Sequence, residues 1–273
     1  MEISINTSIP KIQLSYESTR HKLGMRIWGD RKSFHALHEM LSDSWECEDM
    51  EMSSEESCSY IGIISYFSYE VRHAYMGDRL VTMDGKAVKE WNDEMLQQFE
   101  KEQDRFQVGM EFTWSHMLFI MASWWECLQH KECPSDMLNV MREFTKNIEQ
   151  LLQKQSKRYF PKLEPYLHGA IYAANPYLMH TMEHVELYYL QEAKFWERPH
   201  MDELARIMEC ASYGTLDYNR YLAELDKQAK KLKCRIDELR VDVDDKLYNI
   251  ELKDVNMFCR LLCLKTISVR SAS

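Results

Sequence analysis

The chain has few of the residues that interrupt helices, and it lacks signals that would send it to a membrane. Its 273 residues include only 8 Gly and 6 Pro, which argues against a loop-rich all-β protein and favours long helices. No cationic start is followed by an apolar stretch and a cleavage site, so no signal peptide is expected. The most apolar segment, residues 114–128, is shorter than the ~20 residues of a membrane span. We therefore expect a soluble, cytoplasmic protein with no membrane partner.

Several functional motifs are also missing. The 8 Cys include no Cys-x-x-Cys pair, so we interpret them as reduced and mostly buried. There is no Gly-rich phosphate loop, nucleophile elbow or dinucleotide fingerprint. Basic residues are scarce at the start, because residues 1–130 hold 12 Lys and Arg against 22 Asp and Glu. The net charge of −10 disfavours binding to nucleic acid.

Enough apolar residues are present for a core, since 45% of the chain is hydrophobic and 12% aromatic. In residues 1–130 we expect an α+β unit, namely a small antiparallel sheet with helices. Alternating patterns predict a hairpin over 12–28 and strands at 80–83 and 106–112. Helical spacing predicts helices at 31–44, 61–75 and 114–128, the second ending at the cap residue Gly77. We interpret the acidic, Ser-rich segment 46–56 as a surface loop.

Strand patterns stop after residue 130, and we expect residues 131–273 to form an all-α region, packed separately or as one body with the first. Helices are predicted from the cap Ser135 to about 157, then at 162–173, 176–198 and 201–213. Residues 218–243 carry the most regular pattern, because two sets of apolar positions repeat every seven residues. These sets are Tyr218, Leu225, Leu232 and Leu239, and Leu222, Ala229, Ile236 and Val243.

The heptad pattern has two interpretations. It is typical of a coiled-coil seam, in which Leu222, Leu225, Leu232, Ile236 and Leu239 would join two chains. In a parallel pair, however, Arg235 would face Arg240, which is a contact between like charges. A long helix packed inside its own domain explains the same pattern.

Three short segments resemble, in their order, an uncharacterised bacterial family, a domain of unknown function. They are Leu23-Gly-Met-Arg-Ile-Trp-Gly-Asp30, Tyr69-Glu-Val-Arg-His-Ala-Tyr-Met-Gly-Asp-Arg79, and Phe112-Thr-Trp114 with Leu118-Phe119. The resemblance covers residues 10–130. It implies a small α+β unit in a bacterial cytoplasm and no known activity.

The sharpest chemical signal is His180-Thr-Met-Glu183-His184, which resembles the inverted zinc-protease motif. On a helix, His180 and His184 share one face and could bind zinc, with Glu183 as the general base. A third ligand would have to come from Glu238 or Glu251. The apolar stripe of this helix (Leu178, Met182, Val185, Tyr189, Ala193 and Trp196) lies opposite the two histidines. An accidental pair of surface histidines therefore explains the motif equally well.

A second cluster surrounds Gly77. Arg72 and Arg79 could hold a carboxylate or phosphate, with His73 titrating near neutral pH and Asp78 beside them. The alternative is a capped helix end in which Asp78 and Arg79 are paired.

The leading hypothesis is a non-enzymatic protein-interaction or scaffold protein that binds a protein partner or itself. It rests on the heptad pattern, the 18 Met, the acidic loop and the missing catalytic motifs. The second hypothesis is a metal-dependent hydrolase that uses His180, Glu183 and His184, with zinc as its cofactor. The third is anion or nucleotide sensing at Arg72 and Arg79. The sequence leaves open whether the protein is an enzyme.

Overall fold

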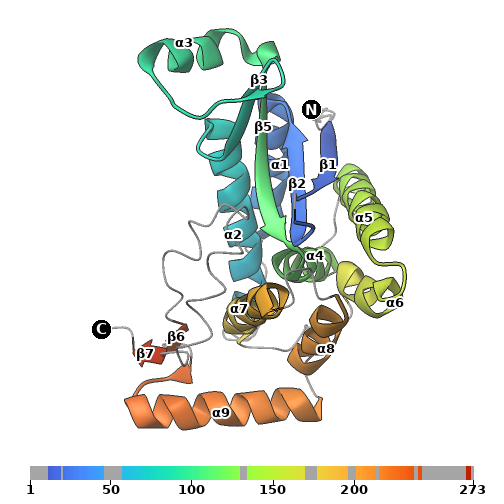
Figure 1. The fold of residues 1–273 in the computed structure, drawn as a ribbon, viewed down its shortest axis with the longest axis vertical. Coiled ribbons are helices and arrows are strands. Elements are labelled where there is room, and N and C mark those ends of the chain that lie inside the picture. The colour runs from blue at the N-terminus through green and yellow to red at the C-terminus, as the bar shows by residue number, and fades with distance from the viewer. Residues whose placement is uncertain are drawn as a thin grey trace, which may run out of the picture.

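The computed structural model describes residues 12–19, 21–45, 57–129, 134–169, 177–195, 201–212, 215–236, 239–241 and 269–271. Within them, an antiparallel sheet lies in the first part of the chain and helices make up most of the rest (Figure 1). The fold class is therefore α+β, as the sequence predicted. The acidic segment 46–56 lies outside the described residues.

The larger sheet has five strands in the order β1 (Leu14–Ser18), β2 (Gly24–Gly29), β5 (Phe106–Thr113), β3 (Leu80–Met83) and β4 (Lys86–Ala87). Residues opposite one another share a face of the sheet. Ile27 and its partner Met110 are both buried, whereas Arg26 and its partner Glu111 form an ion pair on the other face. This alternation, visible in the sequence, predicted the hairpin and the two later strands correctly.

Two helices cover the buried face of this sheet. α1 (Arg31–Trp45) and α2 (Ser57–Met76) pack against each other and against β5 (Figure 1). α2 ends at Gly77, which has φ 89°, and the backbone N–H of Asp78 donates to the carbonyl of His73. Gly77 is thus the C-terminal cap that the sequence predicted.

An arm connects β4 to β5 at the upper end of the sheet in Figure 1. It contains α3 (Asp93–Lys101) and the 3₁₀ turn η1 (Gln103–Arg105), and the side chain of Asn92 caps α3 by accepting the N–H of Met95. Phe99 is the buried residue of α3, and its ring contacts Trp91 and Phe106 edge to face. The arm is therefore attached to the sheet through an aromatic cluster.

α4 (Trp114–Gln129) lies at the lower end of the sheet, and only Trp125 and Gln129 along it are not buried. This confirms the prediction of a helix that is apolar nearly all round. The remaining helices follow: α5 (Ser135–Gln155), α6 (Phe160–Leu163), the 3₁₀ turn η2 (Glu164–His168), α7 (Leu178–Phe195), α8 (Met201–Ala211) and α9 (Leu216–Leu232). Ser135 is the first residue of α5 and Pro134 takes the cap position, so the predicted Ser135 cap was wrong by one residue.

One cluster of buried side chains contains residues from both sides of position 130, from Leu23 in the β1–β2 connection to Ala211 in α8. The β1–β2 connection itself forms hydrogen bonds with several helices. The carbonyl of Leu23 accepts from the backbone N–H of Trp114 and from the hydroxyl of Tyr189 in α7. The carbonyl of Lys22 accepts from the Trp114 indole and from Gln155 at the end of α5. The boundary at residue 130 stays a prediction.

The heptad-patterned helix is shorter than the predicted 218–243. α9 ends at Leu232, because Lys233 has φ 56° and the N–H groups of Lys233 and Cys234 close back onto the last turn. Leu239 lies in a short strand, β6 (Leu239–Val241), which pairs with β7 (Val269–Ser271). The last part of the chain is therefore not entirely helical. Leu-Arg-Val at 239–241 fits the two-residue period of a strand as well as the heptad, and the strand forms.

Candidate functional site

The residues predicted around Gly77 do come together, and a carboxylate that was not predicted joins them. Arg79 donates from Nε and Nη2 to the two carboxylate oxygens of Glu70, at 2.7 and 2.8 Å. This bidentate pair holds the pKa of Arg79 above its usual range. The fork of Arg79 is thus already filled by a carboxylate of the same chain.

The other members of this cluster also have partners within the chain. Nδ1 of His73 lies 2.8 Å from a carboxylate oxygen of Asp78. The His73 ring packs against Tyr69 at a tilt with 4.2 Å between centroids, and the Arg72 guanidinium lies over the same Tyr69 ring. The arrangement is a capped helix end, but the side chains of Asp78 and Arg79 contact His73 and Glu70 instead of each other. Anion binding at Arg72 and Arg79 stays a prediction, and an anion would have to displace Glu70 from Arg79.

Exposed apolar side chains gather beside this cluster. In the described part of the chain, six large hydrophobic side chains are exposed, and four of them belong to α2 and the arm: Tyr69, Met76, Trp91 and Leu96. We call these four residues the α2–α3 surface. Met76 and Leu96 are 52% and 48% exposed.

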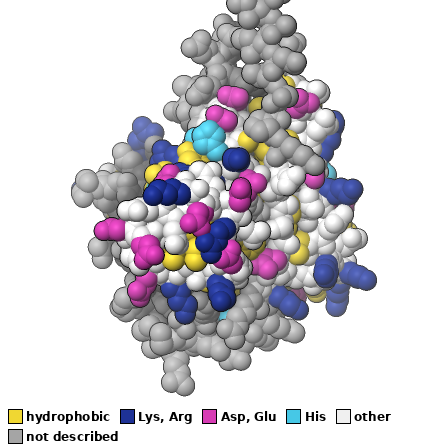
Figure 2. Space-filling view, turned by 90° about the horizontal axis from the view of Figure 1, so that it is seen from above, with side chains coloured by type: hydrophobic (Ala, Val, Ile, Leu, Met, Phe, Trp, Pro, Cys, Tyr) yellow, Lys and Arg dark blue, Asp and Glu magenta, His cyan; other side chains and the backbone are white. Residues whose placement is uncertain are grey.

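Trp91 joins the α2 part of the α2–α3 surface to the arm. Tyr69 and Met76 lie seven residues apart, on one face of α2. Trp91 packs against Gly77, where a ring atom lies 3.2 Å from the position of a β-carbon. Trp91 also contacts Phe99, which lies one turn after Leu96 on α3. Seen from the arm's end of the molecule, hydrophobic side chains lie among charged side chains of both signs (Figure 2).

The arm itself is acidic. Residues 88–105 hold six Asp and Glu against two Lys and one Arg. The arm therefore carries a net negative charge.

The His180-x-x-Glu183-His184 motif lies on α7, as predicted. Leu178, Met182, Val185 and Tyr189 are buried, which confirms the described part of the predicted apolar stripe. Glu183 is half-buried and has an interaction within the chain. The side chains of His180 and His184 lie outside the described residues. Zinc binding by this pair and the role of Glu183 as a general base therefore stay predictions.

The predicted seam residues on α9 contact one another and neighbouring parts of the same chain. Leu225 and Ala229 are buried, and Leu222, Leu232 and Ile236 are partly buried against them. α9 packs on α8 and on β7. These contacts fit the interpretation of a helix packed inside its own domain. Leu239 belongs to β6 instead of the helix, and a seam between chains stays a prediction.

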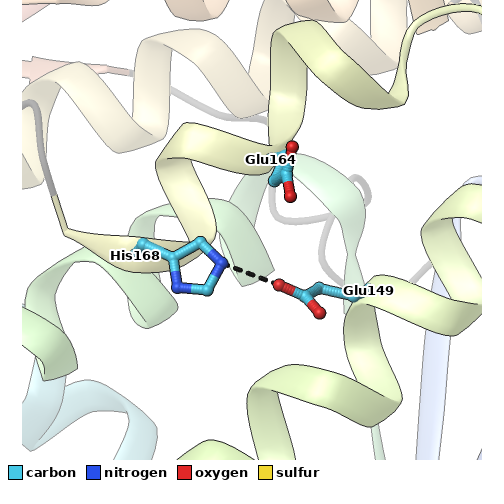
Figure 3. A group of neighbouring side chains, drawn as sticks. All are labelled: Glu149, Glu164 and His168. Atoms are coloured by element: carbon cyan, nitrogen blue, oxygen red, sulfur yellow. Dashed lines mark hydrogen bonds and ion pairs between the residues drawn. The ribbon is translucent and has the colours of Figure 1, made fainter.

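A group of metal-ligating side chains that sequence reasoning missed lies where η2 meets α5 (Figure 3). Glu149 comes from α5, and Glu164 and His168 are the first and last residues of η2. Their ligand atoms all lie within 4.8 Å of one another. Nε2 of His168 lies 2.7 Å from Oε1 of Glu149, and Glu164 is exposed. The four-residue spacing of Glu164 and His168 was the only local signal in the sequence.

A second missed group is a buried carboxylate at the start of α4. Glu186 of α7 accepts from the hydroxyls of Thr113 and Ser115, and Thr113 also caps the N–H of His116. A helix N-terminus favours negative charge, so this contact stabilises the packing of α7 on α4. Burial and the nearby Glu186 raise the pKa of Tyr189 well above its usual range, and Tyr189 therefore acts as a hydrogen-bond donor. The group has a structural explanation.

The family of the chain is shown by its match to one family model. The model of one family matches residues 14–251, which is most of the chain. The chain belongs to the family described as Domain of unknown function (DUF6904). This confirms the resemblance to an uncharacterised family, and the DUF6904 match extends beyond residue 130 into the helical part.

Further comparisons add no activity to the DUF6904 family match. No curated protein and no solved structure matches the chain. In the part of the chain that the structure describes, no helix is long and apolar enough to cross a membrane.

Proposed function

We propose that this DUF6904 protein is a non-enzymatic protein-interaction protein and that the α2–α3 surface is where it docks its partner. The observation that carries the proposal is the concentration of exposed apolar side chains at this end of the molecule. Tyr69 and Met76 lie on α2, Leu96 lies on α3, and Trp91 packs against the glycine that ends α2. Aromatic and Met side chains of this kind are enriched at the centres of protein interfaces.

The charges beside the surface support docking. Arg79 is paired with Glu70, and His73 with Asp78. A partner that covers the apolar side chains would bury an arginine that is already paired with a carboxylate, which lowers the cost of removing water from these two groups. The acidic arm favours a partner whose apolar centre is surrounded by Lys and Arg. A bacterial cytoplasmic location is part of the same proposal.

Photo-crosslinking in cells tests the proposal. A photoreactive phenylalanine analogue replaces Met76 or Leu96 in the full chain, and Leu216 in the control. Leu216 is 76% exposed and lies at the opposite end of the molecule, on α9 (Figure 1). We expect one specific adduct from positions 76 and 96 and none from 216. No adduct from 76 and 96, or the same adduct from 216, would overturn the proposal.

The captured partner is then purified and mixed with the isolated protein. Leu96→Glu should weaken the complex at least about tenfold, which is about 1.4 kcal/mol, because a charge enters the apolar contact. Leu216→Glu should leave the affinity unchanged. An adduct between two copies of this chain would assign the surface to self-association.

A further inference from the structure

We propose that Glu149, Glu164 and His168 bind one Zn²⁺ ion, with water in the remaining coordination positions. Zn²⁺ binds imidazole nitrogen and carboxylate oxygen at about 2.0–2.2 Å, so two of its ligand atoms lie about 3–4 Å apart. The three ligand atoms here already lie within 4.8 Å of one another. Small rotations of exposed side chains bring them to zinc distances.

The three side chains include two carboxylates, and their negative charge favours binding of a cation. Among the described residues, the Glu149 carboxylate is hydrogen-bonded to Nε2 of His168, and the Glu164 carboxylate forms no ion pair. With a neutral imidazole the group carries two negative charges. A divalent ion reduces this charge to zero, which one protonated histidine cannot do.

The ligand types favour zinc over the alkaline-earth ions. Ca²⁺ and Mg²⁺ prefer sites made of oxygen atoms alone, whereas a mixed imidazole and carboxylate set suits Zn²⁺. The neutral His168 tautomer with its proton on Nδ1 presents a lone pair at Nε2. The ion then takes the place of the proton that now joins Nε2 to Glu149.

The surrounding structure holds the histidine in place. The His168 ring lies against Trp125 with 6.1 Å between centroids, and the Trp125 indole donates to Thr145 on α5. Thr145 lies one turn before Glu149 on the same helix face. η2 is fixed beneath by Leu167, whose side chain is fully buried. A supported histidine of this kind loses little freedom on binding a metal.

The solvent side of the site is open. The side chains of His168 and Glu149 are 47% and 27% exposed. Three protein ligands with a free position leave room for water or for a donor atom of another molecule. The site lies on α5 and η2, away from the α2–α3 surface. The zinc proposal is therefore independent of the proposed docking, and failure of one does not affect the other.

Zinc content of the full chain tests the site. The untagged protein is incubated with ZnCl₂, desalted and analysed by elemental mass spectrometry, and its zinc affinity is measured by chelator competition. We expect His168→Gln and Glu164→Gln each to weaken one zinc site at least tenfold, or to lose one equivalent. Because the count is a difference between variants, zinc held by cysteines does not affect it.

Two controls separate this site from other histidines. His35→Gln removes an exposed histidine that lies 3.6 Å from Glu39 on α1. The double variant His180→Ala/His184→Ala removes the motif on α7. Both should retain the site that His168→Gln loses. Equal zinc binding in wild type, His168→Gln and Glu164→Gln, or loss of that equivalent only in the double variant, would overturn the proposal.

Hydrogen exchange gives a readout at the site itself. Zinc should slow exchange of the backbone amides of residues 164–169 in the wild type, because it ties η2 to α5. The His168→Gln chain should show no such slowing. Slowing confined to other helices would contradict a site at this position.

Discussion

The ends of α2 and η2 have similar backbones and different charges. α2 turns through Gly77 and η2 through Gly169, both with left-handed backbone angles (φ 89° and 82°). Each glycine packs against a tryptophan, Trp91 in the first case and Trp125 in the second. Each helix end also carries a histidine bound to a carboxylate, at 2.8 Å for His73 and 2.7 Å for His168.

The difference between the two ends lies in the remaining charges. With histidine counted as neutral at both ends, two arginines and two carboxylates stand beside Gly77. They are Arg72 and Arg79, and Glu70 and Asp78, and Arg79 is paired with Glu70. Beside Gly169, two carboxylates share one histidine. The first end is neutral within the chain and suits burial under a partner protein. The second has an excess of negative charge and suits a cation.

The largest expected effect is a loss of stability when either glycine is replaced by alanine, and the loss should differ between the two positions. Gly169→Ala places a β-carbon 2.8 Å from the Trp125 β-carbon, which cannot rotate away, and it adds left-handed strain. We expect it to lower the free energy of unfolding by about 2–4 kcal/mol. At Gly77 the nearest atoms are ring atoms at 3.2 and 3.3 Å, so Gly77→Ala should cost about 1–2 kcal/mol.

Chemical denaturation of the two variants measures both values. A loss at Gly77 that equals or exceeds the loss at Gly169 would show that the contact at Trp125 is not the tighter one.

The next effect concerns the ion pair that neutralises the α2 end. In Glu70→Gln, only one side-chain oxygen remains to accept a hydrogen bond from Arg79. The other oxygen is replaced by an amide NH2 group, a donor that faces the donors of the guanidinium. Because both side chains are at least two-thirds buried, we expect a loss of about 1–2 kcal/mol. The matched control is Glu39→Gln, since the contact of Glu39 with His35 is exposed on both sides, and it should change stability little.

The same variant tests anion binding. Phosphate should raise the melting temperature of Glu70→Gln and leave that of the wild type unchanged, because Arg79 loses its anionic partner only in the variant. An equal rise in the wild type would show that Glu70 does not block the predicted anion site.

The elements with a strong local period could be predicted from the sequence. α4 is apolar nearly all round, and β2 and β5 alternate, so their type and place were correct. The end of α9 was missed, because the helix turns at Lys233 although the heptad pattern of the sequence continues to residue 243. A left-handed lysine carries no sequence signal comparable to that of Gly77.

The same distinction applies to the candidate sites: residues close together in the sequence were found, and residues joined by tertiary packing were missed. Arg72, His73, Asp78 and Arg79 are neighbours in the sequence and were found together, but Glu70 was missed because it binds from two turns earlier on α2. Glu149 lies far from Glu164 in the sequence, and the turn between α5 and η2 brings them together. Such contacts depend on tertiary packing and have no local motif.

The smallest expected effect is on the pKa of His38, which lies on α1 with its ring against Tyr75 in the last turn of α2. Partial burial, then the charges of Arg72 and His35, lower the pKa of His38 below its usual 6.5. Since the folded state binds this proton less well than the unfolded state, His38 should lower stability as the pH falls through about 6.5. Arg72→Gln should raise the pKa of His38 without restoring it fully, because burial is the larger cause. An NMR titration in which Arg72→Gln lowers this pKa would contradict the assignment.

Anomalous diffraction at the zinc absorption edge, from crystals of the full chain soaked in Zn²⁺, tests the difference in charge between the two helix ends most directly. We predict a peak between Glu149, Glu164 and His168, and none between His73 and Asp78. A peak at His73 and Asp78, or zinc only elsewhere in the chain, would contradict the conclusion that the η2 end alone calls for a cation.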